Sequence, residues 1–144
     1  MTDIQNLRGY SLPTRTCFSD RFRFSLWYLT GRFLVSSGVP GTWWRKSILR
    51  SFGAQIGCGG RIKPRVLISC PWLLSMGDNC WIGEKVWIDN LAPVAIGNNV
   101  CLSQGAYLCT GNHDFRKSTF DLKLDSISVG SQSWIAAFAV IAPG

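Results

Sequence analysis

The chain contains one histidine, His113, and an imidazole is the side chain best able to accept a proton near neutral pH. It comes shortly after an aliphatic series, Ile96, Leu102 and Leu108, that repeats every six residues. A polar segment follows it directly. A proton acceptor placed where a regular scaffold gives way to a loop is a candidate active-site residue, because loops on rigid scaffolds often carry function.

The cysteines give little support for a metal site. The chain has no Cys-x-x-Cys pair, and one histidine cannot complete a zinc site of cysteine and histidine or a site of three histidines. We therefore predict no metal cofactor. We interpret the six cysteines as free thiols of a cytosolic protein; they are Cys17, Cys58, Cys70, Cys80, Cys101 and Cys109.

The element that must position His113 is a repeat of six residues over the second half of the chain. Aliphatic side chains recur with this spacing in four groups of three, and the rhythm resumes after each interruption. The twelve positions are Ile56, Ile62, Ile68, Met76, Ile82, Ile88, Ile96, Leu102, Leu108, Val129, Ile135 and Ile141. A step of six is too short for a strand plus a helix and too regular for a sandwich, whose strands recur every ~8 to 12 residues.

A second column of small or modest side chains follows four residues after the aliphatic positions, as at Val66, Val86, Val100 and Ala106. Glycine, asparagine and aspartate are frequent in the turns between them, and glycine and asparagine tolerate the backbone angles of sharp corners. We predict a mainly β fold, a parallel β-helix with one strand per face and three hexapeptides per turn. The polar excursion at about residues 114–128 is then a loop thrown out from one corner.

The region before the repeat has helical spacing, so we divide the chain into an N-terminal helical segment, residues 1–55, and a β-helix, residues 56–144. One helix is predicted from Asp20, as its cap, to about Ser36, and a second over residues 42–52 with Gly53 as its stop. The expected apolar face of the first helix is formed by Phe22, Leu26, Leu29, Phe33 and Leu34, widened by Trp27 and Tyr28. These helices either cover the end of the β-helix or contact a membrane surface through their aromatic and basic residues.

Composition is typical of one globular domain, with 144 residues of which 47% are apolar and 16% charged. No signal peptide opens the sequence, and the longest uncharged apolar stretch near the start is far shorter than the ~20 residues of a membrane-spanning helix. The net charge of +7 is explained equally well by an anionic partner, such as a phosphate-bearing cofactor or a membrane surface, and by a soluble basic protein without one. We predict no nucleic-acid partner, because the arginines are dispersed and no nucleic-acid-binding motif is present.

Five segments of the sequence resemble the hexapeptide-repeat acyltransferases, and within them the WcaF-like O-acetyltransferases of colanic acid biosynthesis. They spread over nearly the whole chain. The segments are YSLP at 10–13, WWRKSILRSFGAQIG at 43–57, ISCPWLLSMGDNCWIGEKV at 68–86, SQGAYLCTGNHDF at 103–115 and SWIAAFAVIAPG at 133–144.

The resemblance implies a left-handed coil, a homotrimer, and transfer of acetyl from acetyl-CoA to a sugar hydroxyl of an exopolysaccharide or lipopolysaccharide. His113 would be the general base. Further site residues are expected on the coils around it. Trp134, Ala136 and Ala137 would line the groove for the pantetheine arm of acetyl-CoA, and Asp89 and Asn90 would contact the acceptor. Small corner residues and turn residues at these positions also have purely structural explanations.

The family continues with further coils beyond the Ala-Pro-Gly at which this sequence stops, so we expect C-terminal coils to be missing. A truncated, non-catalytic β-helix that serves as a scaffold is therefore the alternative to an active O-acetyltransferase. We expect a cytoplasmic protein, where acetyl-CoA is available, or one held at the inner face of the membrane. Whether the acceptor is lipid-linked stays open at the level of sequence.

Overall fold

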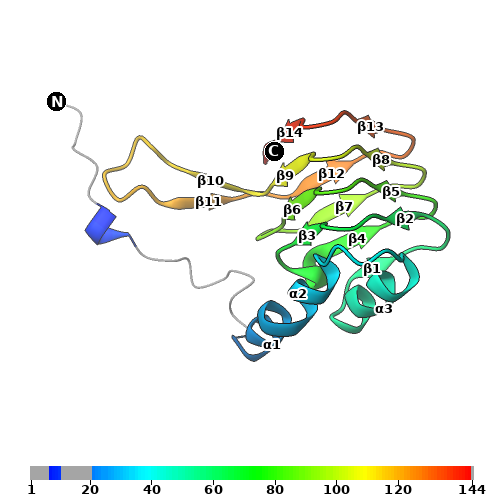
Figure 1. Ribbon diagram of the computed structural model, residues 1–144. Helices are drawn as coiled ribbons and strands as arrows, with labels where there is room; N and C mark the ends of the chain where they lie inside the picture. Colours follow the sequence, from blue (N-terminus) through cyan, green and yellow to red (C-terminus); the bar gives the residue numbers. More distant parts are fainter. Residues whose placement is uncertain (1–6, 11–20, 144) are drawn as a thin grey trace.

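The computed structural model describes residues 7–10 and 21–143, and its main body is a three-sided coil (Figure 1). Each side is a four-stranded parallel sheet. The first sheet contains β1 (Gln55–Ile56), β4 (Leu74–Met76), β7 (Val94–Ile96) and β12 (Ile127–Val129). The second contains β2 (Arg61–Ile62), β5 (Trp81–Ile82), β8 (Cys101–Leu102) and β13 (Trp134–Ile135). The third contains β3 (Leu67–Ile68), β6 (Trp87–Asp89), β9 (Tyr107–Cys109) and β14 (Val140–Ile141).

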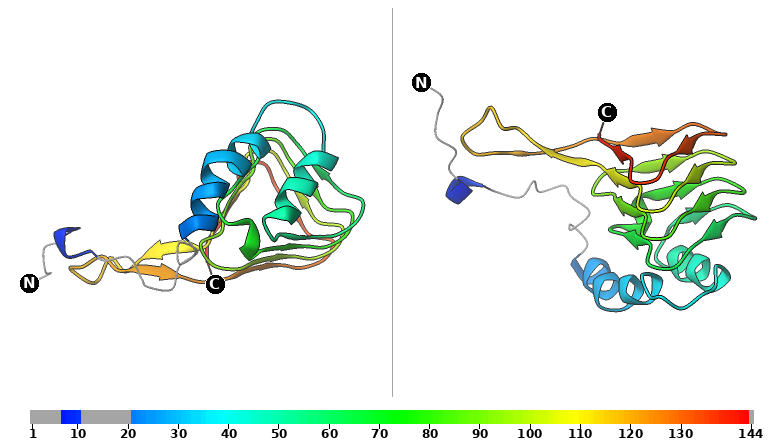
Figure 2. Two further views of the ribbon diagram at one scale, coloured as in Figure 1. Left: turned by 90° about the horizontal axis from the view of Figure 1, so that it is seen from below. Right: turned by 45° about the horizontal axis from the view of Figure 1, so that its top comes forward.

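Successive strands belong to successive sheets, so the chain makes a parallel β-helix, as the hexapeptide spacing predicts. The view along the coil shows the triangular outline, and the view from the side shows the stacked coils (Figure 2). The left-handed sense of the coil remains an expectation from the family resemblance. Short 3-10 segments lie outside the sheets, at Leu7–Gly9 and at Pro71–Leu73, the latter in the corner before β4.

The twelve aliphatic residues of the hexapeptide rhythm stack on one another across the coils. Ile56 pairs with Met76, Met76 with Ile96, and Ile96 with Val129 on the first sheet. The other two sheets repeat this arrangement in the same register. The inner side of each parallel strand is buried, so it needs an apolar residue in register with those of the neighbouring coils. The spacing of six provides one such residue per strand.

Corners between the first and second sheets are held by a ladder of side chains. The Asp78 carboxylate accepts a hydrogen bond from the Cys58 N–H at 2.7 Å, and the Asn98 amide oxygen accepts one from the Asp78 N–H at 2.7 Å. Asn79 and Asn99, at equivalent corners, have φ of 57° and 55°, in the left-handed region that asparagine tolerates. The aspartate and asparagine residues therefore form the corners of the coil, as the sequence predicts.

Helices cover the end of the coil that carries β1, β2 and β3 (Figure 2). The first helical run consists of α1 (Arg21–Leu26), a π-helical segment η3 (Trp27–Gly31) and α2 (Arg32–Val35), and it is followed by α3 (Trp43–Ser51). The second predicted helix is confirmed, and Gly53 follows it with φ of 94°. Asp20, the predicted cap, lies outside the described residues. No helix in the described parts of the chain is long and apolar enough to cross a bilayer.

The orientation of the first helical run differs from the prediction. Trp27, Gly31 and Val35 face the coil, and the indole N–H of Trp27 donates to the Ile68 carbonyl at 3.1 Å. Apart from Trp27, the predicted apolar face points to solvent, with Phe22 and Phe33 exposed at 81% and 74%. Both faces of the run are apolar, and helical spacing alone cannot decide which of two apolar faces is buried.

The interpretation of all cysteines as free thiols is wrong for Cys70, which is disulfide-bonded. The described free cysteines are Cys58, Cys80, Cys101 and Cys109. A disulfide needs two Cα atoms within about 7 Å, and spacing along the chain does not reveal that proximity.

The stack of aliphatic residues predicts that truncating a buried side chain costs more stability than truncating an exposed one. Ile88 is 1% exposed and lies between Ile68 and Leu108, its partners on the two neighbouring coils. Replacing Ile88 with valine removes one methylene and should lower the free energy of unfolding by about 0.5–1.5 kcal/mol in urea titrations. Val140→Ala is the control, because Val140 is 65% exposed and its truncation should change stability by less than about 0.5 kcal/mol.

Candidate active site

The predicted excursion is an antiparallel hairpin that leaves one corner of the coil between β9 and β12. Its strands are β10 (Gly111–His113) and β11 (Leu122–Leu124), and His113 pairs with Leu122 at the outer end of the ladder. The hairpin projects well away from the coil (Figure 1). The chain then rejoins the first sheet at Ile127, opposite Val94, without loss of register.

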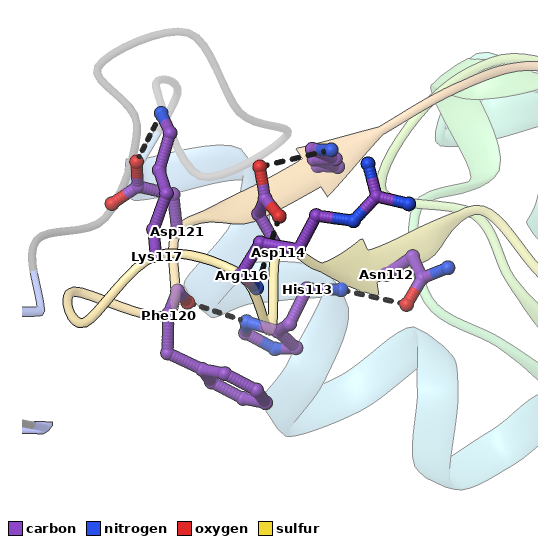
Figure 3. Close-up of polar contacts among 8 residues, drawn as sticks. Asn112, His113, Asp114, Arg116, Lys117, Phe120 and Asp121 are labelled. Carbon is purple, nitrogen blue, oxygen red and sulfur yellow. Dashed lines mark hydrogen bonds and ion pairs between the residues drawn. The ribbon is translucent and has the colours of Figure 1, made fainter. Parts of the chain in front are cut away.

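The His113 ring is fixed on two sides by Phe120, in the turn of the hairpin (Figure 3). The two rings are stacked with centroids 4.4 Å apart and an interplanar angle of 6°. Nδ1 of His113 lies 2.9 Å from the carbonyl oxygen of Phe120. A carbonyl oxygen only accepts, so Nδ1 carries the proton of the neutral ring and Nε2 keeps its lone pair. The Tyr10 ring lies near the imidazole as well, with centroids 5.9 Å apart.

Phe120 has a left-handed backbone conformation, with φ of 51°. Such a conformation costs free energy for a residue that is not glycine, and it persists only where its surroundings impose it. Here the Phe120 N–H donates to the Lys117 carbonyl at 3.0 Å, while its own carbonyl turns toward His113. The strained residue therefore serves to orient the imidazole.

Ion pairs hold the turn of the hairpin in shape (Figure 3). Asp114 lies 3.0 Å from the Lys123 ammonium, and Asp121 lies 2.8 Å from that of Lys117. The hydrogen bond from Lys123 lowers the pKa of the Asp114 carboxyl, and that from Lys117 lowers the pKa of Asp121. Both lysine side chains are more than half exposed, at 59% for Lys117 and 62% for Lys123, so the pairs contribute to the shape of the turn more than to stability.

Asp89 lies at the base of the hairpin, at the end of β6. It is paired with Cys109 on β9, and its backbone carbonyl accepts a hydrogen bond from the Thr110 N–H at 3.1 Å. Its carboxylate accepts hydrogen bonds from the Ser69 hydroxyl at 2.6 Å and the Tyr107 hydroxyl at 3.3 Å. Burial, followed by the neighbouring Cys109 and Asp89, raises the pKa of Tyr107, so its hydroxyl stays protonated and able to donate.

Asn90, the neighbour of Asp89, has a different environment. Its side chain is fully buried, and its amide both accepts from the Cys70 N–H at 2.9 Å and donates to the Cys70 carbonyl at 2.6 Å. The amide thus closes the gap between two coils at the corner after β6, and in this structure it does not face solvent.

Trp134, Ala136 and Ala137 lie on another part of the surface. All three are exposed, and the indole N–H of Trp134 donates to the Ser103 hydroxyl at 2.7 Å. Trp134 belongs to β13 of the second sheet, whereas the hairpin leaves the corner between the third and first sheets. The fold of this chain therefore brings Asp89 and the base of the His113 hairpin together, but it does not bring Trp134 to them.

Sequence reasoning missed the residues that support His113 and Asp89. Phe120, Tyr107 and Ser69 have no motif of their own, because their roles depend on contacts between coils or across a turn. The length of one coil could have revealed one of these contacts. Ser69, Asp89 and Cys109 are 20 residues apart in sequence, so they occupy the same position on successive coils. Within the described residues no group of three or more His, Cys, Asp or Glu side chains is suited to hold a metal ion.

Stacked three-sided coils of parallel strands, with a histidine-bearing hairpin at one corner, define a parallel β-helix protein with a candidate active-site loop. No family model matches the chain. The chain is similar to proteins named colanic acid biosynthesis acetyltransferase WcaF in Escherichia coli (strain K12) and in Shigella flexneri. Each is 34% identical over 142 residues, which cover 98% of this chain and 78% of the relative. The chain belongs to this WcaF family of acetyltransferases, and its class of enzyme is acyltransferase.

Proposed function

We propose that the protein transfers acetyl from acetyl-CoA to a sugar hydroxyl in exopolysaccharide biosynthesis, with His113 as general base. The relatives carry colanic acid biosynthesis in their names, which supports a glycan acceptor. The observation that carries the proposal is the contact of 2.9 Å between Nδ1 of His113 and the Phe120 carbonyl oxygen. It leaves Nε2 with a free lone pair, as a general base requires.

The reaction needs no covalent intermediate with the enzyme. Nε2 of His113 takes the proton of the sugar hydroxyl as the hydroxyl oxygen bonds to the carbonyl carbon of the thioester. The C–S bond then breaks, and the imidazolium returns the proton to the leaving thiolate. The products are an acetylated sugar and CoA, and His113 is restored.

Asp89 is the residue we assign to the acceptor. Its carboxylate has two oxygens with room for more than the two hydrogen bonds it receives from Ser69 and Tyr107. Tyr107 stacks on Trp87 beside it, with centroids 4.7 Å apart, and aromatic rings next to a carboxylate suit a sugar. We assign no acceptor contact to the buried Asn90.

The CoA arm is assigned to the surface of Trp134, Ala136 and Ala137, where small side chains would let the pantetheine approach the backbone. These residues and His113 lie on different parts of one protomer. The proposal therefore includes a homotrimer, in which the hairpin of one subunit reaches the Trp134 surface of its neighbour. Analytical ultracentrifugation tests this part, and a monomer with full activity would contradict it.

Release of CoA from acetyl-CoA in the presence of glycan acceptors tests the proposal as a whole. An acetyltransferase should release CoA only when an acceptor is present, and isothermal titration should show that it binds CoA. A protein that binds no CoA and releases none would be a scaffold, and the proposal would fail.

Replacement of Asp89 by asparagine is expected to raise the KM for the acceptor by about 10- to 100-fold. The change keeps the shape of the side chain but removes the charge, and a hydrogen bond to a charged group contributes about 1.5–3 kcal/mol. The KM for acetyl-CoA should stay the same. Glu84→Gln is the matched control, because Glu84 is a solvent-exposed carboxylate whose ion-pair partner among the described residues is Arg65. Equal KM values for Asp89→Asn and the wild type would remove Asp89 from the acceptor site.

A further inference from the structure

The helices that cover the end of the coil carry a second apolar face that nothing in the described chain covers. Phe22, Leu26, Leu29 and Phe33 recur at spacings of three and four, so they form one stripe along the run from α1 to α2. Their exposed fractions are 81%, 45%, 76% and 74%. The stripe lies opposite the face of Trp27 and Val35, which is buried against the coil. The stripe is therefore an exposed apolar patch that packing against the coil does not explain.

The same end of the molecule carries the positive charge of the chain. Residues 21–77 contain nine Lys and Arg and no Asp or Glu, whereas residues 78–144 contain four Lys and Arg and six Asp and Glu. Arg45 and Lys46 are buried, but Arg21, Arg50, Arg61 and Lys63 are exposed. By the helical period, Arg21 and Arg32 flank one side of the stripe, and Arg32 lies over the Tyr28 ring at 4.8 Å.

We propose that this stripe, formed by Phe22, Leu26, Leu29 and Phe33, docks the protein on the surface of an anionic lipid bilayer. An apolar helix face bordered by arginine and aromatic residues is the arrangement that lies in a membrane interface. Apolar side chains enter the boundary between headgroups and acyl chains, and arginine stems extend their charges to the phosphates. Each basic residue near an anionic surface adds about 1 kcal/mol of attraction.

The geometry gives the docked protein a definite orientation. The helices cover one end of the coil, and the hairpin leaves a corner near the other end (Figure 2). With the helices on the bilayer, the coil axis stands away from the surface and the net acidic half of the chain is kept from it. Charge complementarity thus favours a lipid surface over a second copy of this chain, whose equivalent face carries the same positive charge.

Flotation of the protein with vesicles tests the proposal, without acetyl-CoA or acceptor, so its outcome is independent of the proposed catalytic function. Vesicles of phosphatidylcholine and phosphatidylglycerol in equal parts should carry the protein, and vesicles of phosphatidylcholine alone should carry much less. High salt should weaken the binding, because it screens the charges. The double variant Leu29→Ser/Phe33→Ser should lower partitioning at least about tenfold.

Phe115→Ser is the matched control, because Phe115 is 76% exposed on the hairpin and lies far from the stripe in sequence. It should bind vesicles as the wild type does, and circular dichroism melts should show that both variants are folded. Failure of the wild type to float, or equal losses in both variants, would overturn the proposal. A double variant that floats normally but changes the sedimentation mass would show that the stripe joins protein subunits instead.

Discussion

Replacing His113 with alanine is expected to lower kcat for acetyl transfer by about 10²–10⁴-fold, the usual contribution of a general base. The sugar hydroxyl would then have no group to take its proton as it attacks the thioester. The KM values should change little, because the imidazole acts on the hydroxyl proton and the proposed binding surfaces lie elsewhere. Initial rates of CoA release at saturating substrates measure the effect.

Arg116→Ala controls for disturbance of the hairpin. Arg116 is exposed in the same turn, and its guanidinium lies over the Phe115 ring, 5.8 Å from its centroid. Its removal should leave kcat within about twofold of the wild type, since surface changes are usually small in effect. Equal kcat values for His113→Ala and the wild type would exclude His113 as the base and leave the chemistry to another group.

Replacing Arg45 with methionine is expected to lower the free energy of unfolding by about 3–5 kcal/mol, comparable to breaking a buried charged contact. The Arg45 side chain is fully buried, and its guanidinium donates to four backbone carbonyls between the end of α2 and the start of α3. The acceptors are the carbonyls of Val35, Ser37, Val39 and Gly41. Burial lowers the pKa of the Arg45 guanidinium, but arginine stays charged in proteins, so all its donors are kept.

Urea denaturation measures this loss, and two further variants interpret it. Arg45→Lys keeps the charge, but a single ammonium group cannot reach all four carbonyls, so an intermediate loss is expected. Arg21→Met removes an exposed arginine and should change stability by less than about 0.5 kcal/mol. A midpoint for Arg45→Met equal to that of the wild type would mean that water replaces the guanidinium at no cost.

The coil was predictable from the sequence because its determinants are local and repeated. Each face needs one inward aliphatic residue per strand, and each corner needs a residue that tolerates a sharp turn, so a spacing of six appears directly in the chain. All twelve aliphatic positions from Ile56 to Ile141 pair as that spacing predicts. The second helix was predictable for a similar reason, since Gly53 ends it locally.

The surroundings of the candidate site were not predictable in the same way. His113 stood out because it is the only histidine, but the carbonyl that orients it belongs to Phe120, whose left-handed backbone is set by the fold of the hairpin. Asp89 and Asn90 are adjacent in sequence, yet the Asp89 carboxylate is partly accessible, whereas the Asn90 amide is buried against Cys70. Asp89 is the last residue of β6, whereas Asn90 lies in the corner after it, and its burial depends on hydrogen bonds to the Cys70 backbone of the neighbouring coil.

The sequence by itself determined the three-sided coil, the place of its hairpin and the identity of the one imidazole, because period and composition encode them residue by residue. Only the tertiary structure decided which apolar face of the first helical run meets the coil and which remains free, because both faces satisfy helical spacing and the choice depends on fit against the first coil. It also decided which nitrogen of the neutral His113 ring faces a hydrogen-bond acceptor, because that depends on the Phe120 carbonyl, which the turn brings near.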